Sequence, residues 1–320
     1  MGSGRRESGY IYKTEKNKRL KDMLDITTVI LTYNEEIHIG RCLKNIYELS
    51  KRIVVVDSPS TDRTVEICKE FPKVDVFIHK YPGNQAEQFN WALDNCNINT
   101  QWILRLDADE YLTDELICEI NEIIPGLSSD ISAIVFPLGR AFMGKLLRHE
   151  EVNYMIRLFR TGKARYGTSL MDEHLIVDNG KTIAFNNKFI DDNRNSLSFF
   201  LEKHIKYADR EAIQSLTAEY LTSDRENGGG FCDEVKSVKG KKDKYAKMPL
   251  FWRAFVYFCY RYFVRLSILD GKEGFLWCFL QGWWYRTVVD AKIMEIKRKC
   301  EYNKEKIIKY IEMNNVYKNK

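Results

Sequence analysis

The fold is decided by the stretch W-I-L-R-L-D-A-D, residues 102–109. Its largely apolar start predicts a buried strand, and two carboxylates follow where that strand ends. Open α/β sheets bind their ligands at the carboxyl ends of the strands. Two carboxylates one residue apart on a bend can face a hard cation, and Mg²⁺ or Mn²⁺ prefers oxygen ligands and bridges them to a diphosphate. Such triplets also occur as solvated loop acids, so the surrounding sequence decides between the two interpretations.

The region around this stretch alternates strand and helix patterns, which is typical of a mostly parallel sheet covered by helices. Strands are predicted at 26–31, 53–56, 74–78, 102–106 and 133–137, and helices at 39–49, 62–71, 85–96 and 114–124. Further along, strands are predicted at 154–160 and 175–185, a long helix at 196–221, and aromatic-rich helices from 249 to 299. The Asp178-Asn179-Gly180 turn predicts that residues 175–185 form a hairpin.

The predicted organisation is one large α/β domain with appendages. Its parts are an N-terminal tail (1–25), a catalytic domain (26–222) with a nucleotide-binding half (26–138) and an acceptor half (139–222), a flexible linker (223–248) and a helical extension (249–320). A chain of 320 residues is long enough to bury a substantial core in this way.

Composition excludes several classes of protein. Hydrophobic residues make up 44% and charged residues 30%, which excludes global disorder. The net charge of +5 is too weak to indicate a nucleic-acid partner. The eight cysteines include no C-x-x-C pair, which favours buried thiols in a reducing compartment. The first 25 residues are charged and lack an apolar run, so we expect a cytoplasmic protein.

Two further polar segments follow predicted strands. Thr32-Tyr33-Asn34-Glu35-Glu36 comes after the first strand and offers backbone groups and an aromatic face for a nucleotide base. Residues 57–62, D-S-P-S-T-D, come after the second. Each segment could also be a turn with a helix cap, a common use of Ser, Thr and Asp. Asp57, at the end of its strand, is better placed for a ligand than Asp62, which we expect to cap the helix.

Taken together and in this order, the three segments resemble the glycosyltransferase 2 family. The segment 88–93, Q-F-N-W-A-L, is also similar to a helix of that family. The resemblance covers roughly residues 26–215, and Pro59 departs from it by standing where the family commonly has Gly. It implies a GT-A type α/β fold, in which a mixed sheet is flanked by helices and here carries a C-terminal helical extension.

The resemblance also implies site residues. The uridine pocket would be lined by Thr32, Tyr33 and Glu35, and Asp57 would form a hydrogen bond with the base. Asp107 would contact the ribose or the metal, with Asp109 as the principal ligand of Mn²⁺ or Mg²⁺. The nucleotide-sugar site would also include Ala108 and Gln88. Asp191, in the run Asp191-Asp192-Asn193, is assigned to the metal or diphosphate site.

The catalytic base is expected in Met171-Asp172-Glu173-His174, which is similar to the family's acidic pair with the order reversed. An acceptor hydroxyl is a poor nucleophile, and a positioned carboxylate must take its proton during attack. A single in-line displacement at the anomeric carbon then inverts the configuration. We predict Glu173 as the base, with Asp172 second. Alternatively, both are surface acids before a strand.

The region 250–290 interleaves Trp, Tyr and Phe with Arg. Neither of its apolar runs reaches the roughly 18 residues of a membrane-spanning helix. Aromatic and basic residues together suit a helix that lies in the headgroup region of a membrane. An extra helical pair on the catalytic domain, or a dimer interface, would explain the pattern equally well. Tyr262-Phe263 and Leu269-Asp270-Gly271 are similar to the tail of bacterial relatives that build surface polysaccharide, which implies a lipid-carried acceptor.

The sequence therefore predicts an inverting, metal-dependent glycosyltransferase. It would move a sugar from a UDP-sugar to a glycan or lipid-linked acceptor of surface polysaccharide or lipopolysaccharide, at the inner face of the cell membrane. One alternative is a nucleotidyltransferase of similar architecture, which would generally carry a glycine-rich basic loop after the first strand. Another is a binding protein that retains the fold without catalysis.

Overall fold

The computed structural model describes residues 24–167, 175–221, 245 and 248–314. The chain divides into two compact units, each of which is described by itself. The first unit combines Met1–Gly144 with Val152–Arg194, and the second combines Lys145–Glu151 with Asn195–Lys320.

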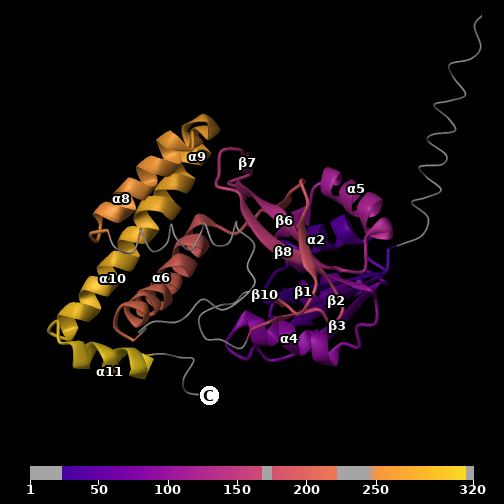
Figure 1. Ribbon diagram of the computed structural model, residues 1–320, viewed down its shortest axis with the longest axis horizontal. Helices are drawn as coiled ribbons and strands as arrows, with labels where there is room; N and C mark the ends of the chain where they lie inside the picture. The colour runs from indigo at the N-terminus through magenta and orange to yellow at the C-terminus, as the bar shows by residue number, and fades with distance from the viewer. Residues whose placement is uncertain (1–23, 168–174, 222–244, 246–247, 315–320) are drawn as a thin grey trace, which may run out of the picture. The chain divides into compact units, whose positions relative to one another are not determined.

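A mixed sheet forms the centre of the first unit (Figure 1). Its strands run in the order β3-β2-β1-β4-β8-β6-β12-β5, with β11 beside β6. Their bounds are β1 Ile26–Thr32, β2 Arg52–Asp57, β3 Val74–Ile78, β4 Trp102–Asp107, β5 Glu110–Leu112, β6 Ile131–Phe142, β8 Asn153–Arg160, β11 Lys181–Ala184 and β12 Phe189–Asp191. Strands β1 to β4 are parallel, and β8 joins β4 to β6 by antiparallel pairing. The predicted fold class is confirmed.

Three of the parallel strands, β1, β2 and β4, are buried on both faces, which explains their largely continuous apolar runs. One face of the sheet packs with α2 (Ile39–Ile46), α3 (Thr64–Lys69) and α5 (Asp114–Ile123), where Ile30, Val55 and Leu43 share a core. The other face packs with α4 (Gln85–Asn95), where Val54 and Phe89 share a second core. Alternate residues of each strand therefore serve opposite cores, and the carboxyl ends of the strands are held at one edge.

The predicted hairpin at 175–185 is wrong. The turn itself is present, with left-handed backbone at Asn179 (φ 52°) and Gly180 (φ 110°). The two flanking strands do not pair with each other: β10 (Leu175–Val177) pairs with β9 (Ala164–Tyr166), while β11 runs parallel to β6. The Ser132 hydroxyl donates to the Asn179 carbonyl at 2.8 Å, and a Cβ on Gly180 would lie 2.0 Å from that hydroxyl oxygen. The turn therefore passes the chain from one sheet to another.

The second unit is mainly helical. Its elements are β7 Lys145–Leu147, α6 Leu197–Tyr220, α8 Trp252–Cys259, the π-helical η2 Tyr260–Val264, the short η3 Ser267–Asp270, α9 Gly271–Trp277, the π-helical η4 Cys278–Trp284, α10 Tyr285–Lys299 and α11 Lys304–Asn314. A core joins α6 to α10 and α11, with Ala212 and Leu216 against Val289 and Ile307. The predicted C-terminal helices are therefore present.

The boundary between the two units of the structure differs from the predicted domain boundary. The predicted catalytic domain includes helix 196–221, whereas the contacts of α6 group it with the C-terminal helices. Of the predicted linker, 223–248, only residues 245 and 248 lie among those that the structure describes. The domain limits drawn from the sequence stay a prediction. None of the helices in the described ranges has the length and hydrophobicity needed to cross a bilayer.

Candidate active site

Three of the polar segments meet at the carboxyl edge of the sheet. In the pairing of β1 with β2, Thr32 lies opposite Asp57, and in the pairing of β1 with β4, Leu31 lies opposite Asp107. The carboxylates of Asp57 and Asp107 thus leave the strands on either side of the end of β1. This is the edge at which open α/β sheets bind ligands.

Asp57 organises the loop that follows β2. It is fully buried, and its carboxylate accepts hydrogen bonds from the Thr32 hydroxyl (2.7 Å) and from the backbone N–H (2.7 Å) and hydroxyl (2.6 Å) of Ser60. The Ser60 hydroxyl oxygen in turn accepts from the backbone N–H of Asn34 at 2.8 Å. Asp57 therefore fixes the two loops to each other. Its contact with a base, and that of Thr32, stay predictions.

The loop after β1 is joined to the start of α3. The backbone N–H groups of Glu35 and Glu36 donate to Thr64 (2.7 Å) and Asp62 (3.0 Å), and Asp62 also accepts from the backbone N–H of Thr64 at 3.0 Å. Tyr33, by contrast, projects from this loop with 61% of its surface exposed. An exposed aromatic ring on an otherwise bonded loop is free to stack on a flat ligand.

Glu35 has a bonding role inside the protein. Its carboxylate lies 2.6 Å from Nδ1 of His38, whose Nε2 accepts from the backbone N–H of Arg194 at 2.9 Å. Because Nε2 is the acceptor, Nδ1 carries the proton and donates to Glu35. His38 is buried, so this chain of bonds ties the loop after β1 to the segment that follows β12.

The turn with Asp107, Ala108 and Asp109 lies between β4 and β5, and residues 191–193 lie against it. The backbone N–H of Asp192 donates to the Asp109 carbonyl at 3.0 Å, and Asn193 Nδ2 donates to the Asp109 carboxylate at 2.8 Å. Asp191 makes an ion pair with Arg140 at 2.6 Å. The structure thus brings Asn193 into contact with the D-x-D turn, while the role of Asp191 as a metal ligand stays a prediction.

Arg41 of α2 holds this turn from the other side. Its Nη2 donates to the carbonyls of Asp109 and Asp192, at 2.9 Å each, and its Nη1 pairs with the Asp192 carboxylate. One guanidinium thus binds both segments that frame the turn. Such a fork of fixed donors suits a positioning role better than a flexible ammonium does.

Two buried arginines lie beneath Asp107. Nη2 of Arg105 is 3.3 Å from one carboxylate oxygen, and Nη2 of Arg157 is 3.4 Å from the other. The Arg157 side chain is 2% exposed, and its guanidinium lies over the Phe189 ring. The side chain of Asp107 is 35% exposed, so the arginines orient it from below while one side stays open to a ligand.

Glu110 completes the support beneath Asp107. It is buried, pairs with Arg157, and accepts the backbone N–H of Asp107 at 2.9 Å. Burial raises the pKa of the Glu110 carboxyl, and the charge of Arg157 opposes that rise. The Glu110 side chain therefore supports the turn and does not reach a ligand at the edge.

Gln88 and Asn90, on the helix with the Q-x-N-W-A-L pattern, make structural bonds. Gln88 is buried, donating to the Ser58 hydroxyl (3.1 Å) and lying 2.7 Å from His79 Nδ1. Asn90 exchanges two 3.0 Å hydrogen bonds with the backbone of Tyr166, the last residue of β9. The contact of Gln88 with a nucleotide-sugar stays a prediction.

Asp172 and Glu173, predicted as the catalytic carboxylates, lie outside the described residues. The residues on either side of them are described. Tyr166 at the end of β9 lies opposite Leu175 at the start of β10 in an antiparallel pair. Asn90 therefore anchors the chain just before this segment, and β10 anchors it just after.

The residues of the turn fit a divalent cation. Asp107 and Asp109 present carboxylate oxygens that are partly exposed, which are the donors that Mg²⁺ and Mn²⁺ prefer. No cluster of three or more His, Cys, Asp or Glu side chains suited to a metal is found in the described part of the chain. A site with one or two carboxylates suits a cation that takes its remaining oxygens from a diphosphate and from water.

Comparison with known proteins decides the family. The sequence profile described as Glycosyl transferase family 2 matches residues 27–191, just over half of the chain. The chain belongs to glycosyl transferase family 2. The resemblance seen in the motifs is thus confirmed, and with it the GT-A type of the fold.

Individual relatives are more distant. The chain is 28% identical over 212 residues to the SPbeta prophage-derived glycosyltransferase SunS of Bacillus subtilis, a match that covers 64% of this chain and 47% of SunS. It is 25% identical over 280 residues to an uncharacterized glycosyltransferase of Rickettsia bellii, covering 86% and 88% of the two chains. A solved structure of Staphylococcus aureus TarS aligns with a TM-score of 0.41 at 15% identity, covering 92% of this chain and 91% of TarS. The chain spans about half the length of SunS.

The supporting residues of this family 2 site were not predicted. They are Arg41, Arg105, Glu110 and Arg157, whereas Asn193 belongs to the run 191–193 that was assigned to the metal or diphosphate. The signal for two of them was present in the sequence, since Arg105 and Arg157 each interrupt an apolar strand. A charged residue in a buried strand needs a partner. The position of that partner could not be predicted from the sequence.

The buried pair beneath the turn leads to a prediction about stability. Replacing Arg157 with Met leaves Glu110 without its positive partner and Asp107 with Arg105 alone, and removing one member of a buried pair costs about 3–5 kcal/mol. Two Arg157 nitrogens, Nε and Nη1, make no hydrogen bond to any described residue, so the pair is incompletely satisfied. The double variant Arg157→Met/Glu110→Leu is therefore expected to have a free energy of unfolding much closer to that of the wild type than Arg157→Met has. Urea titration of the three proteins measures this free energy.

The exposed pair of Arg165 with Asp94 on the same unit is the control. Its side chains are 49% and 52% exposed, so Arg165→Met is expected to change the free energy of unfolding by about 1 kcal/mol or less. If Arg157→Met proves no worse than Arg165→Met, the buried arginine does not hold the turn together.

Proposed function

We propose that this protein transfers a sugar from a UDP-sugar to a hydroxyl of a glycan or lipid-linked acceptor, with inversion at the anomeric carbon. The acceptor would belong to surface polysaccharide or lipopolysaccharide synthesis at the cytoplasmic face of the membrane. The proposal rests on membership of glycosyl transferase family 2 and on the arrangement of the sheet edge.

One observation carries the donor side of the proposal. The D-x-D turn follows β4, and the Thr32–Asp57 pair lies at the ends of β1 and β2, so both flank the same strand end. A nucleoside diphosphate is long enough to use both, with its base at the loops after β1 and β2 and its phosphates at the turn. The exposed ring of Tyr33 is available for the base.

The roles of the turn follow from what surrounds it. Asp109 would be the principal ligand of Mn²⁺ or Mg²⁺, and Asp107, oriented by Arg105 and Arg157, would contact the ribose or the same cation. When bound, the cation neutralises charge that develops on the leaving diphosphate. The chain's own contribution is to hold both carboxylates at fixed places, through the bonds from Arg41 and Asn193.

The acceptor side of the proposal rests on the sequence. Glu173 would take the proton from the acceptor hydroxyl as its oxygen attacks the anomeric carbon. The bond from that carbon to the diphosphate oxygen breaks in the same step, and UDP leaves with the electron pair. Attack and departure on opposite faces of the sugar account for inversion.

A panel of nucleotide sugars tests the donor class. With Mn²⁺ present, UDP-sugars are expected to raise the melting temperature, because a ligand at a hundred times its Kd stabilises the native state by about 2.7 kcal/mol. Differential scanning fluorimetry with UDP-, GDP- and CDP-sugars makes the measurement. EDTA is expected to abolish most of the shift. An equal shift with EDTA, or a preference for CDP- or GDP-sugars, would contradict the proposed donor and its metal.

Two rival functions predict different products. A nucleotidyltransferase releases pyrophosphate from a nucleoside triphosphate and a sugar phosphate, whereas the proposed enzyme releases UDP. A binding protein without catalysis would show the thermal shift and no release of UDP, even over long incubation with a UDP-sugar. Measuring UDP and pyrophosphate in parallel separates the three functions.

A further inference from the structure

We propose that one end of the second unit docks on the surface of an anionic lipid bilayer. The side chains concerned are called the apolar tip. They are Phe263, Val264, Leu266, Ile268, Leu269 and Phe275, which come from η2, the turn after it, η3 and α9 and are 42–69% exposed. The inference concerns a surface outside the candidate active site, and its failure would leave the proposed reaction standing.

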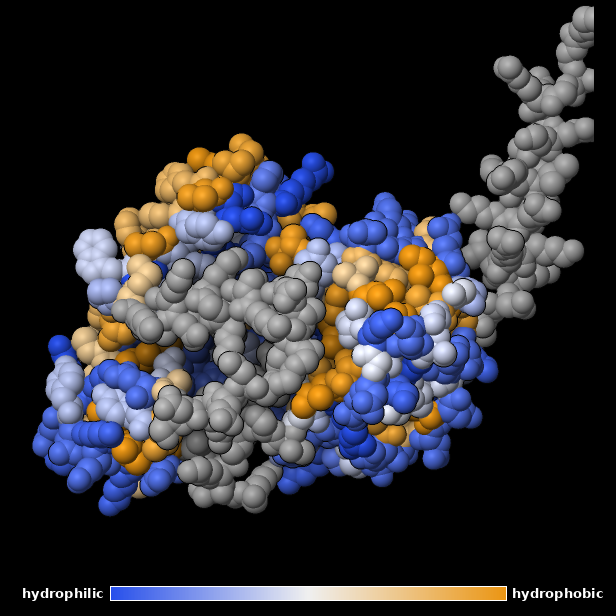
Figure 2. Space-filling model, viewed as in Figure 1, coloured by the Kyte–Doolittle hydropathy of each residue, from blue (hydrophilic) through white to orange (hydrophobic). Residues whose placement is uncertain are grey.

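The apolar tip is a concentrated patch. Figure 2 shows hydrophobic side chains gathered over the end of the helical unit where α8 and α9 lie. Val264 and Leu269 are 69% and 64% exposed, far more than an aliphatic side chain in a core. Contiguous apolar patches of this kind mark interaction surfaces rather than ordinary protein surface.

The backbone presents this patch at a conformational cost. Leu266 adopts a left-handed conformation (φ 62°) while its side chain is 49% exposed. That conformation is uncommon for a residue with a Cβ, and such outliers persist mainly where ligands bind.

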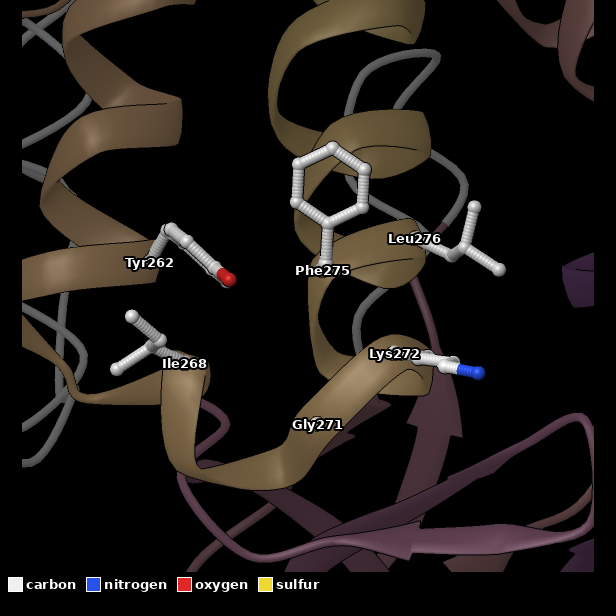
Figure 3. A pocket seen from close by; sticks show the side chains of 6 residues that line it. All are labelled: Tyr262, Ile268, Gly271, Lys272, Phe275 and Leu276. Carbon is white, nitrogen blue, oxygen red and sulfur yellow. The ribbon is translucent and has the colours of Figure 1, made fainter.

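A groove opens within the tip. It has a volume of about 540 Å³ and is lined by Tyr262, Ile268, Gly271, Lys272, Phe275 and Leu276. Figure 3 shows the Tyr262 and Phe275 side chains on facing helices across it, and their ring centroids are 5.6 Å apart. Apolar walls bordered by a lysine match the chemistry of a lipid, with its apolar chain beside an anionic headgroup.

The charges around the tip identify the partner. Residues 260–278 contain two carboxylates, Asp270 and Glu273, and both make hydrogen bonds or an ion pair within the unit. Asp270 is 3% exposed and accepts from the backbone N–H of Arg148 (3.1 Å) and from that of His149 (3.0 Å), while Glu273 pairs with Lys145 at 3.2 Å.

Some basic side chains next to the apolar tip are exposed to solvent. Arg261 is buried and pairs with Glu150, but Arg265 and Lys272 are exposed and make no salt bridge within the described part of the chain. The tip is thus apolar with a positive rim formed by Arg265 and Lys272. This combination complements the headgroups of anionic lipids, which attract basic residues next to inserted apolar ones.

The same charges argue against a second copy as the partner. A two-fold interface places the same patch on both sides, so Arg265 and Lys272 of one copy would face those of the other. Residues 260–278 offer no exposed, unpaired carboxylate to compensate that repulsion. Like charges across an interface are unfavourable, and a negatively charged bilayer has no such conflict.

Vesicle binding by the full chain tests the proposal. Sucrose-loaded vesicles of phosphatidylcholine, alone or mixed with phosphatidylglycerol, are sedimented with the protein, and the bound fraction is measured. We expect binding to the mixed vesicles that weakens as salt is raised. The double variant Val264→Asp/Leu269→Asp is expected to lose about tenfold or more in partitioning, because it places charge where apolar side chains enter the lipid.

A second variant tests the positive rim. Arg265→Gln/Lys272→Gln is expected to lower partitioning to the anionic vesicles by about twenty- to thirtyfold, at about fivefold for each cation near such a surface. Binding to phosphatidylcholine alone should change little. Two control variants of matched chemistry lie on α11 or in the turn before it, and α11 is at the other end of α10 from α9 in Figure 1. Both Tyr302→Asp/Met313→Asp and Lys304→Gln/Lys309→Gln should bind as the wild type does.

Three results would overturn the proposal. In the first, the wild type fails to sediment with the anionic vesicles. In the second, the tip variants bind as tightly as the α11 controls. In the third, light scattering shows a wild-type dimer that Val264→Asp/Leu269→Asp dissociates, which makes the tip an interface between copies. The thermal shift with UDP and Mn²⁺ is measured on every variant, and it is expected to stay unchanged because these residues lie outside the candidate active site.

Discussion

Asp109→Ala is expected to lower the rate of sugar transfer by about a thousandfold, since a bound cation supplies several kcal/mol of charge stabilisation in the transition state and each 1.36 kcal/mol is tenfold in rate. The same variant should lose the dependence of UDP affinity on Mn²⁺. In the wild type the Asp109 side chain is half-buried, and one of its carboxylate oxygens accepts a hydrogen bond from Asn193. The carboxylate is therefore held in place before any cation binds.

Calorimetry of UDP binding, with Mn²⁺ and then with EDTA, measures this effect directly. For the wild type we expect a clear loss of affinity in EDTA, and for Asp109→Ala similar weak binding in both buffers. Asp94→Ala serves as control, because Asp94 belongs to an exposed pair and should behave as the wild type does. Unchanged UDP affinity of the wild type in EDTA would remove the metal from the proposed mechanism.

The sequence was sufficient to predict the parts of the fold that are continuous along the chain. Strand β3 was predicted with its observed bounds, Val74–Ile78, and β1 to within one residue. Strand β1 is buried on both faces, so its continuous apolar run carries the signal, and the partly exposed edge strand β3 is marked by its β-branched and aromatic residues. The short strands β5, β9 and β12 were missed. Each has three residues, too few for any periodicity, and each forms because another segment pairs with it: β5 with β12, β9 with β10, and β12 with β5 and β6.

The turn at Asn179-Gly180 shows a second limit. Its chemistry was predicted correctly, and its left-handed backbone is observed. A turn sequence specifies local conformation, but it does not determine whether the flanking strands pair with each other. Here the partners are supplied by β9 and β6, and the Ser132 bond to the turn fixes that arrangement.

The residues of the candidate site also fall into two groups, those that could be predicted from the sequence and those that could not. The residues that end strands could be found from the sequence, because a polar run after an apolar one is visible locally. The residues that support them could not, since the partners are far apart in the chain. Arg41 and Asp192 are separated by 151 positions, and Arg157 and Glu110 by 47. Only the fold brings such pairs together, and a buried arginine signals merely that some partner exists.

Glu173→Gln is expected to lower turnover by about 10²–10⁴-fold, the usual contribution of a positioned general base, while leaving UDP affinity nearly unchanged. Glutamine keeps the size and shape of the side chain and removes only the basic oxygen. This separates Glu173 from Asp109, whose loss should impair both transfer and metal-dependent binding. The assay follows UDP release with acceptor present, beside calorimetry of UDP on the same preparation.

The neighbouring carboxylate provides the matched control for Glu173. Asp172→Asn makes the equivalent change one position earlier, in the same segment between Tyr166 and Leu175, so any general disturbance of that segment should affect both variants alike. The pair of strands on either side, and the two bonds from Asn90 to Tyr166, anchor the chain at both ends of this segment. If Asp172→Asn is inactive and Glu173→Gln retains its turnover, the base is Asp172. If both variants turn over normally, the proton is taken elsewhere, and the similarity of residues 171–174 to the family's acidic pair is accidental.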